Sequence, residues 1–227
     1  MFTISVILVT LMGQSSAADA GRIAEAERLG ACLAKIKEDP EEAYEDALAW
    51  VGEGGRPFAR ACTAEALLEL GHYEEAAIRL EDLANAEGSG SLSQRVVYLT
   101  KSGNAWLVAG QPEAALVTLN NALRLNPRDV NLRVDRAVAL MALERWQEAE
   151  EDLSDALVSL INPGEAYRLR AETRLNLGNL DGAREDVTKA IELDIEDVDA
   201  HVLNGLIKQA TWELENNPPP DRIEILE

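Results

Sequence analysis

The sequence contains few aromatic residues, although it is rich in other apolar side chains. Aromatic residues make up 4% of the 227 residues, whereas hydrophobic residues make up 47%. The apolar content argues against disorder, and leucine, alanine and valine must fill the core. Leucine and alanine favour helices, while β-branched and aromatic residues favour strands. The composition therefore predicts an all-α protein.

Histidine and cysteine are equally scarce, which excludes several kinds of site. The chain has two histidines, His72 and His201, and two cysteines, Cys32 and Cys62. Two cysteines alone cannot form a structural zinc site, and two distant histidines argue against a nucleophile–histidine dyad. The glycine-rich residues 88–90 lack the following lysine of a phosphate-binding loop. We expect a non-catalytic protein without metal or cofactor.

Basic residues are outnumbered by acidic ones. There are 21 lysines and arginines against 41 aspartates and glutamates, which gives a formal net charge of −20. Such a surface repels phosphate backbones and anionic lipid headgroups. We therefore expect no nucleic-acid partner and no peripheral membrane binding. The charge attracts basic partners or, more simply, keeps the protein in solution.

Two dense acidic runs occupy residues 148–152 and 194–199. A carboxylate pair acting on a glycosidic bond must be held across a cleft at a fixed separation. The first run falls on an expected second helix and the second run on an expected turn. We expect both runs to be solvated surface.

No apolar run is long enough to cross a bilayer, which takes about 20 residues. The longest covers residues 4–12 and is followed by small residues that include Ala17, Ala18 and Ala20. This length and these small residues are typical of an export signal. We predict a signal peptide over residues 1–18, with cleavage possible up to Ala20, and an exported protein, with the periplasm as the expected compartment. The alternative is a short buried helix.

Small residues recur along the chain with a period close to 34. The gaps between successive members of the first series are 33, 39, 34, 34 and 34. Twelve positions after each of the first five members stands an alanine. The two series are Ala31, Ala64, Gly103, Ala137, Ala171 and Gly205, and Ala43, Ala76, Ala115, Ala149 and Ala183. Each unit reads as two antiparallel helices whose backbones approach at small residues, with apolar residues three and four apart lining one face.

Turn signals separate the two helices of most units. Gly71, Gly110 and Gly178 stand where a helix must end, and glycine adopts the left-handed conformation of such an end without steric cost. The unit from residue 130 has Glu144 at this place and must turn without glycine. The sequence leaves open whether the neighbouring Trp146 packs in the core or is exposed to a partner.

These features resemble the tetratricopeptide repeat, whose period is about 34 residues. The best match, residues 96–129, carries Gly103, Trp106, Gly110, Ala115 and a closing Pro127. The resemblance implies a right-handed superhelical solenoid of antiparallel helix pairs with a C-terminal capping helix. The implied parts are a degenerate helical pair at 22–54, repeats at 57–90, 96–129, 130–163 and 164–197, a capping helix at 198–215 and a flexible tail at 216–227.

The resemblance also implies a concave groove lined by the first helices, in which ligands lie. Carrying the family's groove positions onto this sequence gives Val97, Thr100, Asn104, Leu107, Asn131, Val134, Val138, Met141, Arg168 and Glu172. The groove residues favour a scaffold or adaptor that binds a protein or peptide segment, with no membrane insertion after signal removal. The alternative is a soluble receptor for a small apolar ligand, and the apolar stripe can equally be core. Some family members clamp acidic tails with several lysines and asparagines; here Glu165 and Glu172 oppose such a tail.

Cys32 and Cys62 fall on the expected first helices of adjacent units. Neighbouring first helices pack side by side, so a disulfide between them is conceivable, and an exported protein meets an oxidising environment. Two small buried thiols are the other interpretation.

Overall fold

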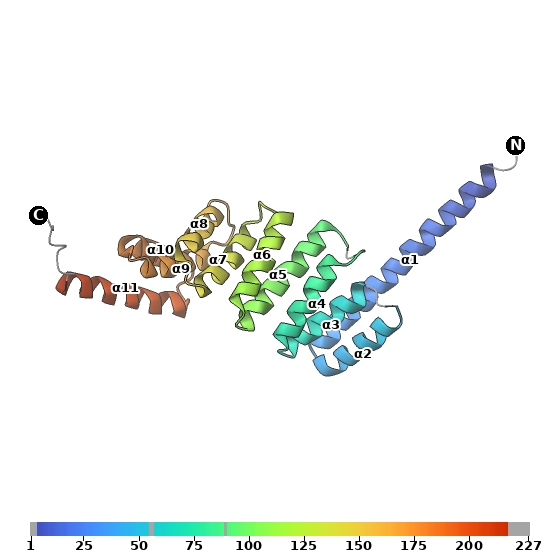
Figure 1. The fold of residues 1–227 in the computed structure, drawn as a ribbon, viewed down its shortest axis with the longest axis horizontal. Helices are drawn as coiled ribbons and strands as arrows, with labels where there is room; N and C mark the ends of the chain where they lie inside the picture. Colours follow the sequence, from blue (N-terminus) through green and yellow to red (C-terminus); the bar gives the residue numbers. More distant parts are fainter. Residues whose placement is uncertain (1–3, 55–56, 89, 218–227) are drawn as a thin grey trace, which may run out of the picture. The chain divides into compact units, whose positions relative to one another are not determined.

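The computed structural model describes residues 4–54, 57–88 and 90–217, with side-chain surroundings from residue 20 onward. Within these residues the chain forms eleven α-helices and no strand (Figure 1). The predicted all-α fold of paired helices is therefore confirmed. The chain divides into two compact units after Ala109.

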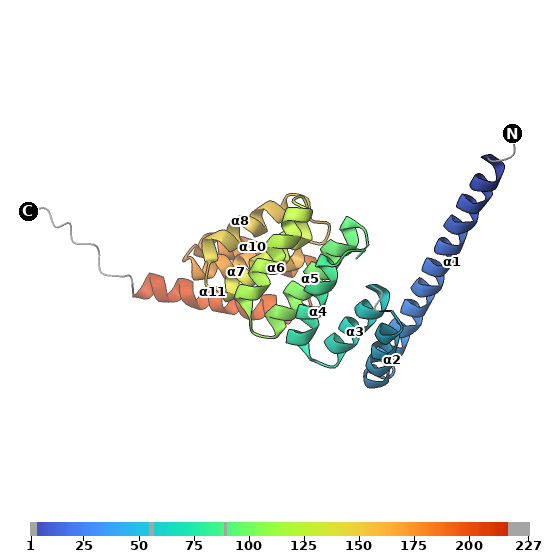
Figure 2. The same cartoon turned by 45° about the vertical axis from the view of Figure 1, so that its right-hand side comes forward.

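The first unit contains five helices. The segment that links α1 to α2 is short, and α1 packs against both α2 and α3. The early part of α1 extends beyond these two helices (Figures 1 and 2). Further along, α2 contacts α3, α3 contacts α4 and α4 contacts α5. The helices are α1 (Ile4–Ile36), α2 (Pro40–Gly52), α3 (Pro57–Glu69), α4 (Tyr73–Asn85) and α5 (Leu92–Val108).

The second unit contains six helices. Successive helices contact one another from α6 to α11, and α9 also contacts α7 and α11. The alternate helices α7, α9 and α11 therefore lie next to one another. The helices are α6 (Pro112–Leu125), α7 (Val130–Ala142), α8 (Trp146–Leu157), α9 (Gly164–Asn176), α10 (Leu180–Leu193) and α11 (Val198–Asn216).

Alanines mark the places where paired helices pack together. Ala137 of α7 and Ala149 of α8 are both fully buried and share a core cluster with Leu140 and Leu153. Ala171 of α9 belongs to the equivalent cluster of the next pair. Because an alanine side chain is a single methyl group, the larger leucines one turn away can fill the space between the helices without voids. Trp146 is half-buried against the first of these clusters, so part of its ring packs in the core and part of it is accessible.

The turns between paired helices use a left-handed residue at a fixed place. The φ angle is +79° at Gly71, +73° at Gly110 and +76° at Gly178. The equivalent residue between α7 and α8 is Glu144, with φ +56°, the only positive φ of a residue other than glycine in the described chain. There the N–H of Arg145 donates to the Leu140 carbonyl of α7 at 2.9 Å, as the N–H groups of His72 and Asn179, each next to a turn glycine, do in their own turns. The turn thus keeps its geometry and accepts a strained glutamate.

The last helix repeats a first helix and has no second helix after it within the described residues. Its buried side chains Ala200, Leu203 and Ile207 complete the core of α9 and α10. In α9 the side of the helix that meets α10 carries Tyr167 and Leu175. The residues one period later are His201 and Gln209, and both are exposed. With these polar residues at the positions of Tyr167 and Leu175, α11 can face solvent where a further helix would otherwise pack.

Two predicted segments lie partly outside the described residues. The predicted signal, residues 1–18, includes residues 1–3, which are not described, and a part of α1 without described side chains, so its cleavage remains a prediction. The predicted tail starts at the end of α11, and residues 218–227 are not described. Among the helices of the described chain, none has both the length and the apolar character needed to span a bilayer.

The strained turn generates a stability prediction. Replacing Glu144 with glycine removes the clash of a Cβ atom at positive φ, and glycine's larger loss of chain entropy offsets part of the gain. We expect Glu144→Gly to raise the free energy of unfolding by about 0.5–1 kcal/mol in urea titrations. The control Glu151→Gly, at an exposed position within α8, should lower it by about 1 kcal/mol. A loss of stability in Glu144→Gly would contradict the account.

Candidate peptide-binding face

The repeat period arranges side chains of α7, α9 and α11 in rows across adjacent helices. One row consists of Val134, Arg168 and Val202, and the next consists of Val138, Glu172 and Leu206. We call these six residues the first-helix face. Val202 is 58% exposed and Leu206 50% exposed, and the other four are half-buried. The face is therefore open to solvent at α11 and rests partly on the core at α7.

The predicted groove residues on α7 differ from one another in how far they are buried. Met141 is 9% exposed and belongs to the core cluster between α7 and α8. Val134 and Val138 pack against the same cluster with part of their surface. Asn131 is exposed at the start of α7, where its N–H donates to Asp129. The apolar stripe predicted for the groove is thus partly core, and Met141 contributes little surface to a ligand.

The predicted groove residues of the first unit lie on α5. Val97 is 50% exposed and Asn104 is exposed, while Thr100 and Leu107 are half-buried. The Thr100 hydroxyl donates to the Val96 carbonyl of its own helix at 2.9 Å. Within the same unit, Lys101 forms a salt bridge with Glu65 at 2.5 Å. The Lys101 ammonium is therefore already paired within the protein.

Arg168 is engaged in the same way in the second unit. Its guanidinium lies 3.6 Å from the carboxylate of Asp197, and both side chains are about one-fifth exposed. Asp197 also accepts a hydrogen bond from the Ala200 N–H and so caps α11. Arg168 thereby links α9 to the turn before α11. The pocket beside this pair is lined by Glu165, Arg168, Asp194, Asp197 and Asp199 together with neighbouring apolar residues.

Two carboxylates on second helices are buried, although one of them belongs to a run expected on the surface. The run 148–152 was expected to be solvated, but Asp152 is 3% exposed, and Asp186 of α10 is 1% exposed. Arg136 of α7 donates two hydrogen bonds to Asp152, each 2.6 Å long. Arg170 of α9 donates two to Asp186, at 2.7 and 2.9 Å. The expectation of solvated surface is wrong for Asp152, because a charged residue is buried when a bidentate partner satisfies it.

Each arginine of these pairs also reaches the preceding second helix. Arg136 donates to Asn120 of α6 at 2.8 Å, and Arg170 donates to Ser154 of α8 at 3.1 Å. The hydrogen bonds donated to Asp152 raise the pKa of Arg136 above its ordinary value, and those donated to Asp186 do the same for the pKa of Arg170. The arginines therefore stay charged and each holds three helices together. We call this arrangement the arginine ladder.

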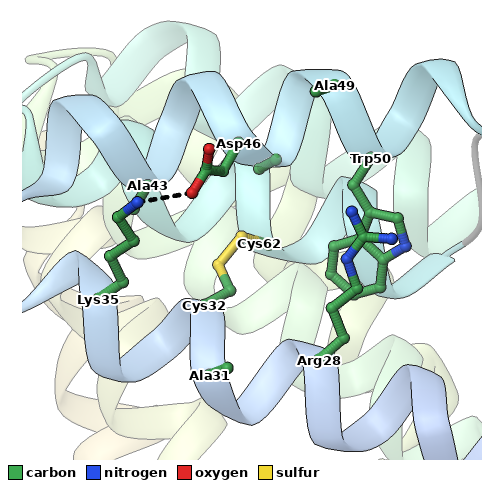
Figure 3. Close-up of a pocket in the computed structure, with 10 residues that line it drawn as sticks. Arg28, Ala31, Cys32, Lys35, Ala43, Asp46, Ala49, Trp50 and Cys62 are labelled. Atoms are coloured by element: carbon green, nitrogen blue, oxygen red, sulfur yellow. Dashed lines mark hydrogen bonds and ion pairs between the residues drawn. A yellow bond between two sulfur atoms is a disulfide. The ribbon is translucent and has the colours of Figure 1, made fainter.

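A disulfide joins α1 to α3 in the first unit. Cys32 and Cys62 are bridged with their Cα atoms 6.1 Å apart. Cys62 is buried, while Cys32 borders a cleft between α1 and α2 with a volume of about 370 Å³. Figure 3 shows Arg28 and Lys35 of α1 on either side of the disulfide.

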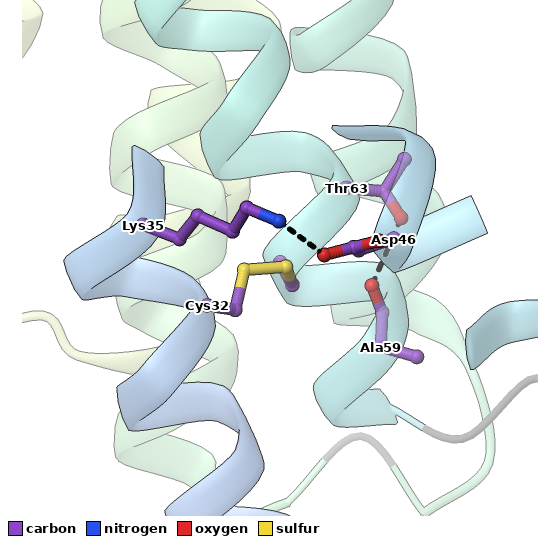
Figure 4. The surroundings of a disulfide bond; sticks show 6 residues. Cys32, Lys35, Asp46, Ala59 and Thr63 are labelled. Carbon is purple, nitrogen blue, oxygen red and sulfur yellow. Dashed lines mark hydrogen bonds and ion pairs between the residues drawn. A yellow bond between two sulfur atoms is a disulfide. The ribbon is translucent and has the colours of Figure 1, made fainter. Parts of the chain in front are cut away.

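Ion pairs and a stacking contact occupy the charged groups around this cleft. The Lys35 ammonium lies 2.6 Å from Asp46, and this hydrogen bond raises the pKa of Lys35 (Figure 4). The Arg28 guanidinium stacks over the Trp50 ring at 4.6 Å from its centroid and bonds Glu53 at 2.6 Å. The cleft thus has an apolar floor and charged groups that already have partners.

Comparisons with known proteins agree with the paired-helix fold. A tetratricopeptide-repeat family model matches residues 107–172. RNA polymerase II-associated protein 3 of Xenopus tropicalis is 30% identical over 108 residues, which are 48% of this chain and 16% of that relative. The first TPR of Spaghetti, solved bound to the HSP90 peptide SRMEEVD, is 26% identical with a TM-score of 0.51 and covers 53% of this chain and 95% of its own.

A bacterial structure matches a larger share of the chain. TTC0263, a thermophilic TPR protein of Thermus thermophilus, is 25% identical with a TM-score of 0.56 and covers 82% of this chain and 99% of its own. In contrast, the chain spans only 16% to 33% of the length of the curated relatives it matches. The likeness to those relatives therefore concerns their repeat segments.

The arginine ladder generates a second stability prediction. Replacing Asp186 with alanine leaves Arg170 and Arg174 without the carboxylate that both contact at 2.7 Å. Removing one partner of a buried ion pair costs about 3–5 kcal/mol, and we expect a loss near the lower figure because the arginines keep some solvent contact. The matched control is Asp181→Ala on the same helix, whose side chain is 92% exposed. Equal effects of the two substitutions in denaturant titrations would contradict the ladder.

The disulfide gives a third prediction. The bridge closes a loop over a sequence separation of 30, for which the chain-entropy model gives a stabilisation of about 3–4 kcal/mol. We expect thiol titration of denatured, unreduced protein to find no free thiol, and Cys32→Ser with Cys62→Ser to lower the free energy of unfolding of the first unit. Two titratable thiols in protein recovered from an oxidising compartment would refute the pairing.

Proposed function

We propose that this chain, a tetratricopeptide-repeat protein, is a non-catalytic adaptor that binds an extended segment of another protein on its first-helix face. One observation carries the proposal: solvent-accessible apolar and charged side chains stand in matched rows on three adjacent helices. Regularly spaced positions suit a segment that lies across the helices, because an extended chain presents side chains at regular intervals.

The buried carboxylates support a non-catalytic role. A general acid or base needs a proton that it can exchange with a substrate. Asp152 and Asp186 are instead covered by arginines that hold adjoining helices together. Their position in the ladder makes them structural groups, whereas the Glu172 carboxylate on the first-helix face can act as a recognition group.

The relatives support binding of a peptide, while the residues of this chain argue against the same peptide. The first TPR of Spaghetti was solved with an acidic HSP90 peptide. In this chain Arg168 is paired with Asp197, and Glu172 stands in the middle of the face. A carboxylate-rich tail would meet repulsion there, so we propose a different class of segment.

We further propose that the protein is exported, with the periplasm as its compartment. The apolar residues 4–12 followed by small residues support this placement. The pairing of Cys32 with Cys62 adds independent support, because disulfides persist in oxidising compartments.

A small apolar ligand is the second candidate for the same face. Val202 and Leu206 are exposed apolar side chains one turn apart on α11, and they offer such a ligand a surface. The charged Arg168 and Glu172 on the neighbouring helix favour the peptide, since both would have to be covered by an apolar molecule.

Site-specific crosslinking tests the proposal. A photoreactive residue replaces Leu206 on the first-helix face, and the control carries it at Lys208, which is exposed on another side of the same helix. We expect a discrete protein adduct at position 206 in intact cells that express the protein, and none at 208. The small-ligand alternative predicts no protein adduct at 206 and a bound lipid or metabolite in organic extracts of purified protein. The same adducts at both positions would contradict the proposed face.

A further inference from the structure

We propose that the segment bound on the first-helix face is basic: an arginine or lysine pairs with Glu172, and apolar side chains on both sides contact Val138 and Leu206. This inference rests on the proposed function and specifies its partner. Glu172 occupies the middle helix of the row, between an apolar residue on α7 and another on α11. The row therefore has the order apolar, acidic, apolar.

Glu172 is available for such a contact. Its side chain is half-buried on α9, and within the described residues its carboxylate forms no salt bridge. A partly desolvated carboxylate gains more from a cationic hydrogen-bond donor than a fully exposed one does. Its position between two apolar neighbours would shield the new ion pair from water.

The geometry sets the spacing of the segment. Packed helices lie about 8–10 Å apart, so the outer positions of a row across three helices are separated by about 20 Å. A chain in the polyproline II conformation advances about 3.1 Å per residue and repeats its side-chain direction every three residues, so roughly six residues cover this distance. The basic residue therefore stands about three residues from each apolar residue on the same side of the segment, with the intervening side chains free to vary.

The surrounding charges favour a basic segment. The row next to Glu172 contains Arg168, whose positive charge would oppose it, but Asp197 neutralises this arginine. The following row contains the exposed Glu165 and Asp199, which border the pocket at that end of the face. Asp135 of α7 already interacts within the protein, so its charge is left out. The remaining charges on and next to the face, those of Glu165, Glu172 and Asp199, are negative, as is the net charge of −20.

A randomised nonapeptide library displayed on phage tests the inference. It is selected on the purified full-length protein, and every enriched peptide is then assayed on a Leu206→Asn variant, which removes the apolar end of the face without adding charge. We expect the peptides that lose binding to Leu206→Asn to be enriched in a lysine or arginine about three residues from an apolar residue. Circular dichroism melting verifies that each variant is folded.

Charge substitutions then assign the basic residue to its partner. We expect Glu172→Gln to weaken the enriched basic peptides at least tenfold in fluorescence anisotropy, and Glu172→Arg to select acidic peptides instead. The control Glu185→Gln makes the same change at an exposed site on α10 and should leave the affinity within twofold.

The outcomes separate the inference from the function on which it rests. If peptides require Leu206 but show no basic preference, or if Glu172→Gln binds them as well as the parent protein does, the inference fails and the adaptor function stands. If no enriched peptide loses affinity on Leu206→Asn, the first-helix face does not bind segments and both proposals fail.

Discussion

The close packing of paired helices at alanine is the constraint on which the second unit depends. Ala137 and Ala149 are fully buried, and so are their counterparts Ala171 and Ala183. A larger side chain at any of these places would force the helices apart, because protein interiors have no spare volume. The same close approach recurs in each helix pair and so sets the positions of all other side chains. Both the arginine ladder beneath the surface and the rows of the first-helix face follow from it.

The arginine ladder and the first-helix face use polar side chains differently. Those of the ladder stabilise the fold, and those of the face are proposed to contact a partner. The arginines of the ladder satisfy buried aspartates and reach the preceding helix, so they tie successive helix pairs together. Arg168 similarly fixes the turn before α11. Glu172 forms no such structural ion pair among the described residues. Its carboxylate can therefore pair with a cationic group of a partner.

Much of the fold was predictable from the sequence, because helix pairing leaves a regular signal. The period of small residues and the glycines at positive φ indicated the all-α class correctly. Sequence reasoning missed the ladder, since acidic runs usually lie in solvent. The signal was present: the spacing from Arg136 to Asp152 is repeated from Arg170 to Asp186, one period later. The surroundings of Met141 could not be predicted, because a shift of a single position on a helix separates a groove position from the core.

Hydrogen–deuterium exchange of the protein with and without a saturating selected peptide tests the central claim most directly, because it reports each helix separately. The account predicts slower exchange in α7, in α9 and in residues 198–206 of α11, with α8 and α10 unchanged. Backbone amides of first helices should open less often once a segment lies across them. Protection confined to α8 and α10, or protection of none of these helices while the peptide is bound, would contradict the claim that the first-helix face is the binding site.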